Sequence, residues 1–84
     1  MQPIHELINR VQWDKDFAQA DFIIGFYDRV EEHIILKSMK QISFDKGDHY
    51  FFYFYDDEGE EHSVPLHRIK QVFRNGELIW HREH

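Results

Sequence analysis

The sequence has 84 residues, of which 42% are hydrophobic and 31% are charged. This length predicts a single domain over residues 1–84 and excludes a two-domain enzyme, while the hydrophobic fraction excludes an intrinsically disordered chain. The sequence contains no Cys, which excludes disulfides, thiolate metal sites and cysteine nucleophiles. The formal charge of −6 argues against a generic polyanion binder, although protonation of all seven His would bring it to +1.

The N-terminal segment predicts an amphipathic helix over residues 3 to about 12. Its apolar residues recur with the spacing i, i+3, i+4 and i+7, as Ile4, Leu7, Ile8 and Val11. The first residues lack the basic region and apolar stretch of a signal peptide, and no apolar run approaches the ~18 residues of a membrane span. We therefore expect a cytoplasmic protein without membrane association.

Apolar and aromatic segments separated by polar turns predict antiparallel strands. The predicted strands are residues 22–27, 33–37, 49–55, 61–64, 69–74 and 77–82. Polar residues at 28–32 and 45–48 form the expected turns, and Gly25 marks a bulge or a close approach of another element. In the aromatic strand, Phe52 and Phe54 are expected in the core, whereas its tyrosines could also be exposed and stack on bases.

The strongest local signal is Asn75-Gly76, which predicts a two-residue type I′ hairpin. A regular hairpin around this turn would pair Phe73 with Leu78 and Gln71 with Trp80. Residues 65–69 could form one helical turn or an extended corner. The fold class is therefore α+β: an N-terminal helix packed on a bent antiparallel sheet of five or six strands, which could close into a small barrel.

Arg and His side chains near the turns are the candidates for chemistry, because a guanidinium fork suits phosphate oxygens and an imidazole can donate a proton. The alternative is that each is an ordinary surface charge, with Arg29 paired to a neighbouring carboxylate. His62 and His67, and His81 and His84, could hold a metal, but no acidic residue stands at a diagnostic interval. We therefore predict no metal, no cofactor and no catalytic residue.

Several segments, taken in order, carry a resemblance to one family. They are residues 3–10, 13–14, 26–29 (with Tyr-Asp-Arg), 64–69 (with Pro-Leu-His-Arg-Ile), 74–80 and Arg82. In these segments the sequence resembles the RNA cyclic group end recognition domain, a small archaeal and bacterial family long listed as uncharacterised. That domain also occurs in larger animal proteins beside RNA-end-processing domains. By position, the resemblance implies RNA-end-binding residues at Tyr27, Asp28, Arg29, His67, Arg68, Trp80 and Arg82.

The resemblance implies a module that binds the RNA 3′ end, with a 2′,3′-cyclic phosphate, in RNA repair or processing. Arg29 and Arg68 would grip the phosphate, with Asp28 orienting Arg29. His67 would donate to a ring or ribose oxygen, and Tyr27 or Trp80 would stack on the last base. RNA-processing enzymes are the expected partners.

Two other functions stay open at this point. Exposed aromatic residues could make the chain a protein-interaction or dimerisation domain. Alternatively, His67 as general base and a second His as acid could open the cyclic phosphate, as in a phosphodiesterase. The sequence offers only one well-matched His for this reaction, so we rank the binding module first.

Overall fold

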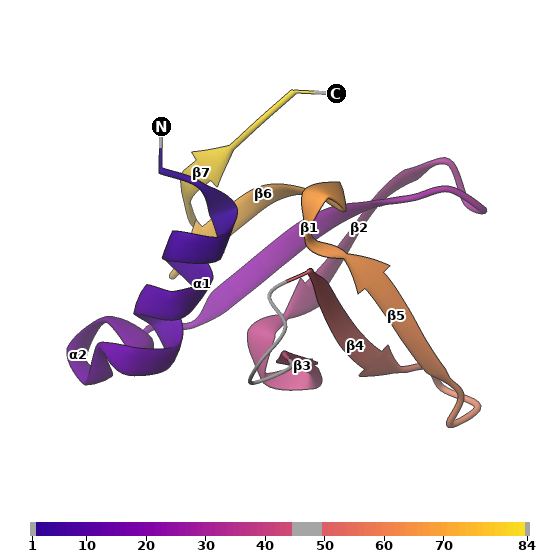
Figure 1. Ribbon diagram of the computed structural model, residues 1–84, viewed down its shortest axis with the longest axis horizontal. Helices are drawn as coiled ribbons and strands as arrows, with labels where there is room; N and C mark the ends of the chain where they lie inside the picture. The colour runs from indigo at the N-terminus through magenta and orange to yellow at the C-terminus, as the bar shows by residue number, and fades with distance from the viewer. Residues whose placement is uncertain (1, 45–49, 84) are drawn as a thin grey trace.

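The computed structural model describes residues 2–44 and 50–83, and the predicted turn at 45–48 lies outside them (Figure 1). The described residues form two α-helices, two single 3₁₀ turns and seven strands. In chain order these are α1 (Ile4–Trp13), α2 (Lys15–Ala18), β1 (Phe22–Asp28), β2 (His33–Ser38), η1 (Met39–Gln41), β3 (Ile42–Phe44), β4 (Phe51–Tyr55), β5 (Glu61–Pro65), η2 (Leu66–Arg68), β6 (Ile69–Arg74) and β7 (Glu77–His81).

The strands are divided between two antiparallel sheets, which confirms the α+β class. One sheet has the order β2-β1-β6-β7 and the other has the order β3-β4-β5. The single sheet expected from the sequence is thus split, and the described strands do not close into a barrel. The chain passes between the sheets through η1 and η2, because each 3₁₀ turn ends one strand and redirects the next. At η1 the turn is capped by the Ser38 hydroxyl, which accepts a hydrogen bond from the Lys40 N–H at 3.2 Å.

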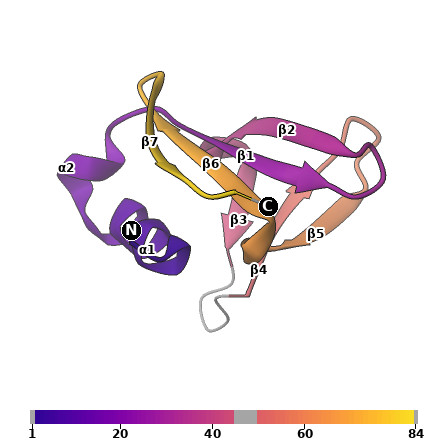
Figure 2. The same ribbon diagram turned by 90° about the horizontal axis from the view of Figure 1, so that it is seen from above.

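The predicted helix is confirmed as α1, and its apolar stripe packs on the core. Ile4, Leu7 and Ile8 are buried and belong to one cluster with inward-facing residues of both sheets. Figure 2 shows α1 and the three-stranded sheet side by side along the four-stranded sheet. Within the described residues, no helix is both long and apolar enough to cross a membrane.

The aromatic strand β4 joins the small sheet to this core. Phe52 is fully buried, and its ring lies 5.2 Å from that of Phe26 in an edge-on arrangement. Phe54 is partly buried and lies 5.7 Å from the same ring. Tyr55 is exposed. The expected core positions at Phe52 and Phe54 are therefore confirmed.

The turn at Asn75-Gly76 has the backbone expected of a type I′ hairpin. Both residues have positive φ, 49° at Asn75 and 83° at Gly76. The pair Phe73–Leu78 is as predicted, but a bulge then shifts the register, so that Trp80 faces Val72 and not Gln71. The predicted Gln71–Trp80 pair is wrong because a regular ladder was assumed, whereas the extra residue of a bulge changes which face the following side chain occupies.

We expect Gly76→Val to destabilise the fold by about 1 kcal/mol or more. No atom lies within 4 Å of a Cβ built at Gly76, so the effect would come from the positive φ and not from a clash. Urea unfolding measures it. The control is Glu77→Val, which adds the same side chain one residue later at negative φ, in a strand that favours β-branched residues. Equal stability of the Gly76→Val variant and the native chain would contradict the turn assignment.

Candidate functional site

A small hollow lies where the two sheets meet. It has a volume of about 160 Å³ and is lined by residues of β1 and the turn after it, of β4 and β5, and of η2. Among the seven residues predicted for the site, it brings together Tyr27, Asp28, Arg29 and Arg68. These residues come from two segments about 40 positions apart in the sequence. Since η2 returns the chain from the small sheet to β6, it brings Arg68 to the end of β1.

Asp28 shapes the turn that carries Arg29. Its Oδ1 accepts hydrogen bonds from the N–H groups of Val30, at 2.7 Å, and Glu31, at 3.0 Å. Aspartate favours turns through such local bonds. Asp28 and Arg29 form no ion pair in the described part of the chain. Asp28 thus bonds to the backbone of the turn that carries Arg29 and not to the Arg29 guanidinium.

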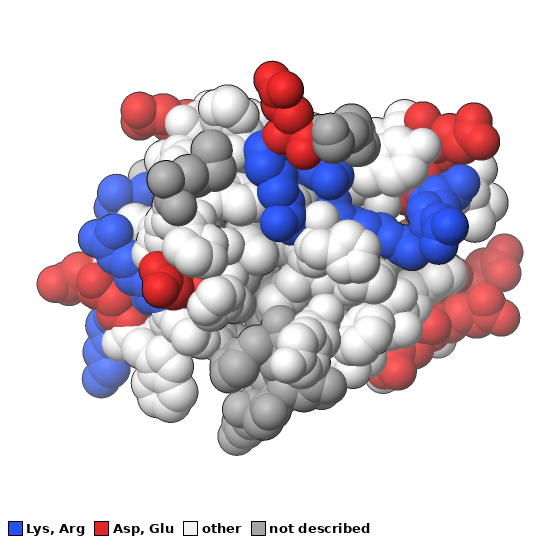
Figure 3. All heavy atoms as spheres, turned by 45° about the horizontal axis from the view of Figure 1, so that its top comes forward, with Lys and Arg blue, Asp and Glu red and all other residues white. Residues whose placement is uncertain are grey.

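Arg29 and Arg68 make no ion pair or hydrogen bond with any described residue. The alternative of an Arg29 paired to a neighbouring carboxylate is therefore wrong for this part of the chain. Figure 3 shows Lys and Arg atoms in a band from the centre of one face to its right side, with acidic atoms at the margins. Two guanidinium groups with free donors at one hollow form a local cationic site on a chain of net charge −6.

His62 lines the same hollow and was missed by the sequence analysis as a site residue. Its Nε2–H donates to Asp56 Oδ2 at 2.7 Å, and its ring stacks on Phe54 with centroids 5.1 Å apart. A signal was present: His62 and Val64 lie two positions apart on β5, so they share one face of the strand. Lys37 Nζ also lies over the Phe54 ring, 4.7 Å from its centroid.

Asp56 holds both His62 and the loop between β4 and β5. Its Oδ1 accepts from the N–H groups of Glu58 and Glu60, each at 2.9 Å. The His62 bond, followed by the Glu60 N–H, lowers the pKa of the Asp56 carboxyl. Because its pKa is lowered in the folded chain, the ionised Asp56 carboxylate stabilises the fold at pH values above the usual carboxyl pKa. This stabilisation is lost as the pH falls through the lowered pKa. Asp56 is therefore fully ionised at neutral pH.

Asp56, Glu60 and His62 place one ligand atom each within 4.8 Å of one another, as a metal site could. Both Asp56 oxygens are already acceptors, for the loop N–H groups and for His62. A metal would have to replace the His62 bond, so we assign the cluster to loop structure. No cofactor is assigned to the hollow either.

Three predicted site residues, His67, Arg82 and Trp80, lie outside this hollow. His67 is exposed on η2 and is absent from the hollow lining, although it precedes Arg68. Arg82 donates through Nε to the Ile69 carbonyl at 2.8 Å and through an Nη to the Leu66 carbonyl at 2.9 Å. Partial burial lowers the pKa of Arg82, which nevertheless stays protonated at neutral pH. Arg82 therefore fastens η2 to the last strand.

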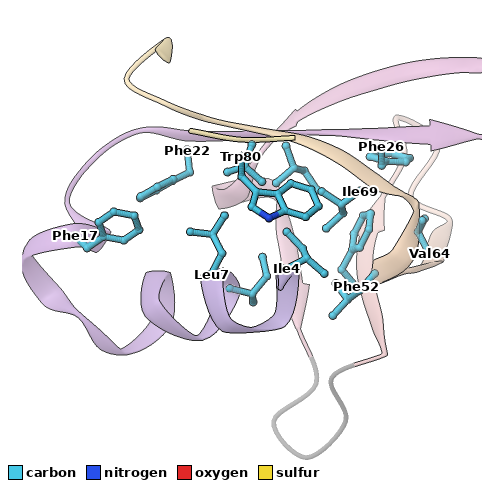
Figure 4. Close-up of a cluster of buried hydrophobic side chains, with 13 residues drawn as sticks. Ile4, Leu7, Phe17, Phe22, Phe26, Phe52, Val64, Ile69 and Trp80 are labelled. Atoms are coloured by element: carbon cyan, nitrogen blue, oxygen red, sulfur yellow. The ribbon is translucent and has the colours of Figure 1, made fainter. Parts of the chain in front are cut away.

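Trp80 is a core residue and cannot stack on a base. Only 6% of its surface is exposed, and its Nε1–H donates to the Gln2 carbonyl at 2.6 Å. Figure 4 shows the indole among the buried side chains, near Leu7, Ile4 and Ile69. The bulge in β7 is the cause, because it turns Trp80 to the face of the sheet that packs on α1. The stacking role predicted for Trp80 is therefore wrong.

Two guanidinium groups that have no ion pair in the described residues line one narrow hollow of this small α+β fold, an arrangement suited to a compact anionic group. The chain belongs to the MJ1316 RNA cyclic group end recognition domain family, whose model matches residues 1–82. The predicted family is thus confirmed, and its name supports an RNA-end binding role. Comparisons with curated proteins and with solved structures found no match.

Proposed function

We propose that the hollow between the two sheets binds a 2′,3′-cyclic phosphate, or a related phosphorylated group, at the 3′ end of an RNA. The observation that carries this proposal is that Arg29 and Arg68 line one hollow without an ion pair in the described residues. Both can therefore direct their donors at phosphate oxygens. Tyr27 lines the same hollow and would contact the terminal nucleoside.

The size and charge of the hollow favour an end group over a long chain of phosphates. Pockets for drug-sized ligands have volumes of roughly 300 Å³ or more, whereas this hollow has about 160 Å³. A net charge of −6 would repel a long polyanion, since each phosphate contact needs a local cation. A single end phosphate needs only the local cationic site.

We infer that the domain binds the end without converting it. Opening a cyclic phosphate uses a base to activate water and an acid to protonate the leaving oxygen. His62 is the one imidazole among the described residues that line the hollow, and its Nε2 is bonded to Asp56. We therefore propose a module of RNA repair or processing in the cytoplasm, which presents bound ends to a partner enzyme.

The direct test compares one short RNA with three different 3′ ends: 2′,3′-cyclic phosphate, linear 3′-phosphate and hydroxyl. We expect the cyclic end to bind at least tenfold more tightly than the hydroxyl end, and mass spectrometry to find it intact after incubation. The linear phosphate separates recognition of the ring from attraction to charge. Equal affinity for the cyclic and hydroxyl termini would contradict this proposal. Conversion of the cyclic terminus during the incubation would show that the domain is an enzyme and not a binding module.

Binding of the cyclic end should tighten as the pH falls from 8 to 6. Imidazoles gain a proton in this range, whereas the cyclic phosphate keeps its charge. Carboxylates, guanidinium groups and ammonium groups do not in general titrate between pH 6 and 8, so the imidazoles are the side chains that change charge. Since Nε2 of His62 already donates to Asp56, the new proton goes to Nδ1 and adds a positive charge at the hollow.

His62→Gln should flatten this pH dependence, and His67→Gln is the matched control. Both are exposed histidines on neighbouring elements, but only His62 lines the hollow. The family resemblance implies His67 as the donor. A pH dependence lost in His67→Gln and retained in His62→Gln would therefore support that role for His67 and contradict the one proposed for His62.

A further inference from the structure

A second hollow lies on the outer face of the four-stranded sheet, the face opposite α1. It has a volume of about 310 Å³, about twice that of the first hollow. Ile34 and Leu78 give it apolar walls, and Lys70, Gln71 and Arg82 contribute polar groups. The functional site described above uses none of these side chains except Arg82, which has a structural role there.

Because Gly25 has no side chain, neighbouring side chains can lie directly against the backbone of β1 at this point of the outer face. A Cβ at Gly25 would lie 2.8 Å from Gln71 Oε1 and 3.0 Å from Ile34 Cγ2, which is too close for either to stay in place. Gln71 and Ile34 therefore settle over the backbone of β1. The close approach expected at Gly25 from the sequence is confirmed, and it brings an amide and an aliphatic side chain together at one point.

The side chains of this outer hollow fit one nucleotide. Aliphatic surfaces can pack against a base, and the Gln71 amide can both donate to and accept from a base edge. Lys70 has no ion pair with another described residue, so its ammonium is available to a phosphate. Glu83 also lines the hollow and opposes a phosphate, but Lys70 and Arg82 together outweigh its charge.

The two hollows are neighbours on the surface. Arg68 lines the first and Lys70 the second, and two residues of chain span at most about 7 Å between their Cα atoms. Tyr27 lines the first hollow, and Ile34, its cross-strand partner, lines the second.

We propose that the outer hollow is a subsite for the penultimate nucleotide of a single-stranded RNA whose terminal phosphate occupies the first hollow. Lys70 contacts the phosphate between the last two nucleotides, Gln71 contacts the base edge, and the base packs against Ile34 and Leu78. This inference rests on the proposed function and adds the substrate class: an unpaired 3′ end at least two nucleotides long. A blunt duplex end would not fit, because its penultimate base is paired.

The test compares a 2′,3′-cyclic mononucleotide with a dinucleotide that carries the same cyclic end. We expect the dinucleotide to bind the native chain about tenfold more tightly. One additional contacted phosphate should also steepen the dependence of log K on log salt by about 0.7. Lys70→Ala and Gln71→Ala should each reduce this advantage and leave mononucleotide affinity unchanged. Lys15→Ala removes the same charge from α2, far along the chain, and should change neither affinity.

Four outcomes overturn the inference. Equal affinity of the native chain for the two ligands shows that no second nucleotide is bound. An equal loss in Lys70→Ala for both ligands shows a general charge effect and no subsite, and the proposed function then stands without it. If neither ligand binds, the proposed function and the subsite fall together. If the outer face instead seats a second copy of the chain, Leu78→Ser would change sedimentation and leave the dinucleotide advantage intact.

Discussion

Replacing Arg29 or Arg68 by Ala should lower the affinity for a cyclic-phosphate RNA end at least tenfold while leaving the fold intact. A hydrogen bond to a charged group contributes about 1.5 to 3 kcal/mol, and 1.4 kcal/mol corresponds to a factor of ten. Neither side chain bonds to another described residue, so its removal leaves no described group without a partner. Fluorescence anisotropy with a labelled oligonucleotide measures the loss.

Two controls separate geometry from charge. Arg→Lys at position 29 or 68 keeps the charge but cannot form the two-pronged contact, so we expect it to weaken binding too. Arg74→Ala removes the same charge elsewhere, because the Arg74 guanidinium stacks over the Phe17 ring at 4.8 Å, and it should leave affinity nearly unchanged. An equal loss for Arg74→Ala and Arg68→Ala would show that only the net charge matters.

Trp80→Ala should destabilise the fold by about 3 to 5 kcal/mol, which is a large part of the stability of a domain this small. The indole is buried between α1 and the four-stranded sheet, so truncation leaves a cavity at the junction of the two. It also removes the donor to the Gln2 carbonyl. Urea unfolding followed by far-UV circular dichroism measures the effect.

Trp13 provides a matched control, since 82% of its surface is exposed. Trp13→Ala should change the free energy of unfolding by no more than about 0.5 kcal/mol. Trp80→Leu keeps an apolar side chain in the core but removes the aromatic ring, and its folded fraction should bind the cyclic end as the native chain does. A folded Trp80→Leu variant that loses binding would support the base-stacking role that the burial of Trp80 argues against.

Elements with a strong local signal could be predicted from the sequence. The helix α1 follows from the spacing of Ile4, Leu7 and Ile8, and these residues are the buried ones. The turn at Asn75-Gly76 follows from the need for positive φ at both positions. In each case the residues that determine the structure are neighbours in the chain, so no knowledge of distant contacts was needed.

The bulge in β7 could not be predicted from the sequence, and it is the reason that Trp80 lies in the core. Ile79 is the extra residue of the bulge, so the next side chain points to the opposite face of the sheet from the one that a regular strand would give it. The alternation of apolar and polar residues around Ile79 is too weak to predict this change. The structural role of Arg82 could not be predicted for a related reason. Its acceptors are carbonyls of η2 and β6, which come near Arg82 only in the folded chain. The motif therefore marked the segments that line the hollow without distinguishing the residues that line it from those with a structural role.

The composition of the hollow depends on how the two sheets meet. Arg68 lines the hollow because it belongs to the 3₁₀ turn η2. The sequence alone left open whether residues 65–69 form a helical turn or an extended corner. His62 reaches it through the register of β4 and β5, which pairs His62 with Phe54. Such long-range pairing has no marker in a single sequence. The resemblance identified Arg29 and Arg68, and the structure added His62.

The most direct test of the account is a nuclear magnetic resonance titration of the isotopically labelled chain with a dinucleotide ending in 2′,3′-cyclic phosphate. The account predicts that the largest shifts fall on the side-chain Nε–H signals of Arg29 and Arg68 and on the amides of 26–30 and 62–64, which surround the hollow. The same dinucleotide with a hydroxyl end should leave these signals nearly unmoved. Shifts confined to His67 and α1, or equal shifts with both ends, would contradict the claim that this hollow recognises the RNA end.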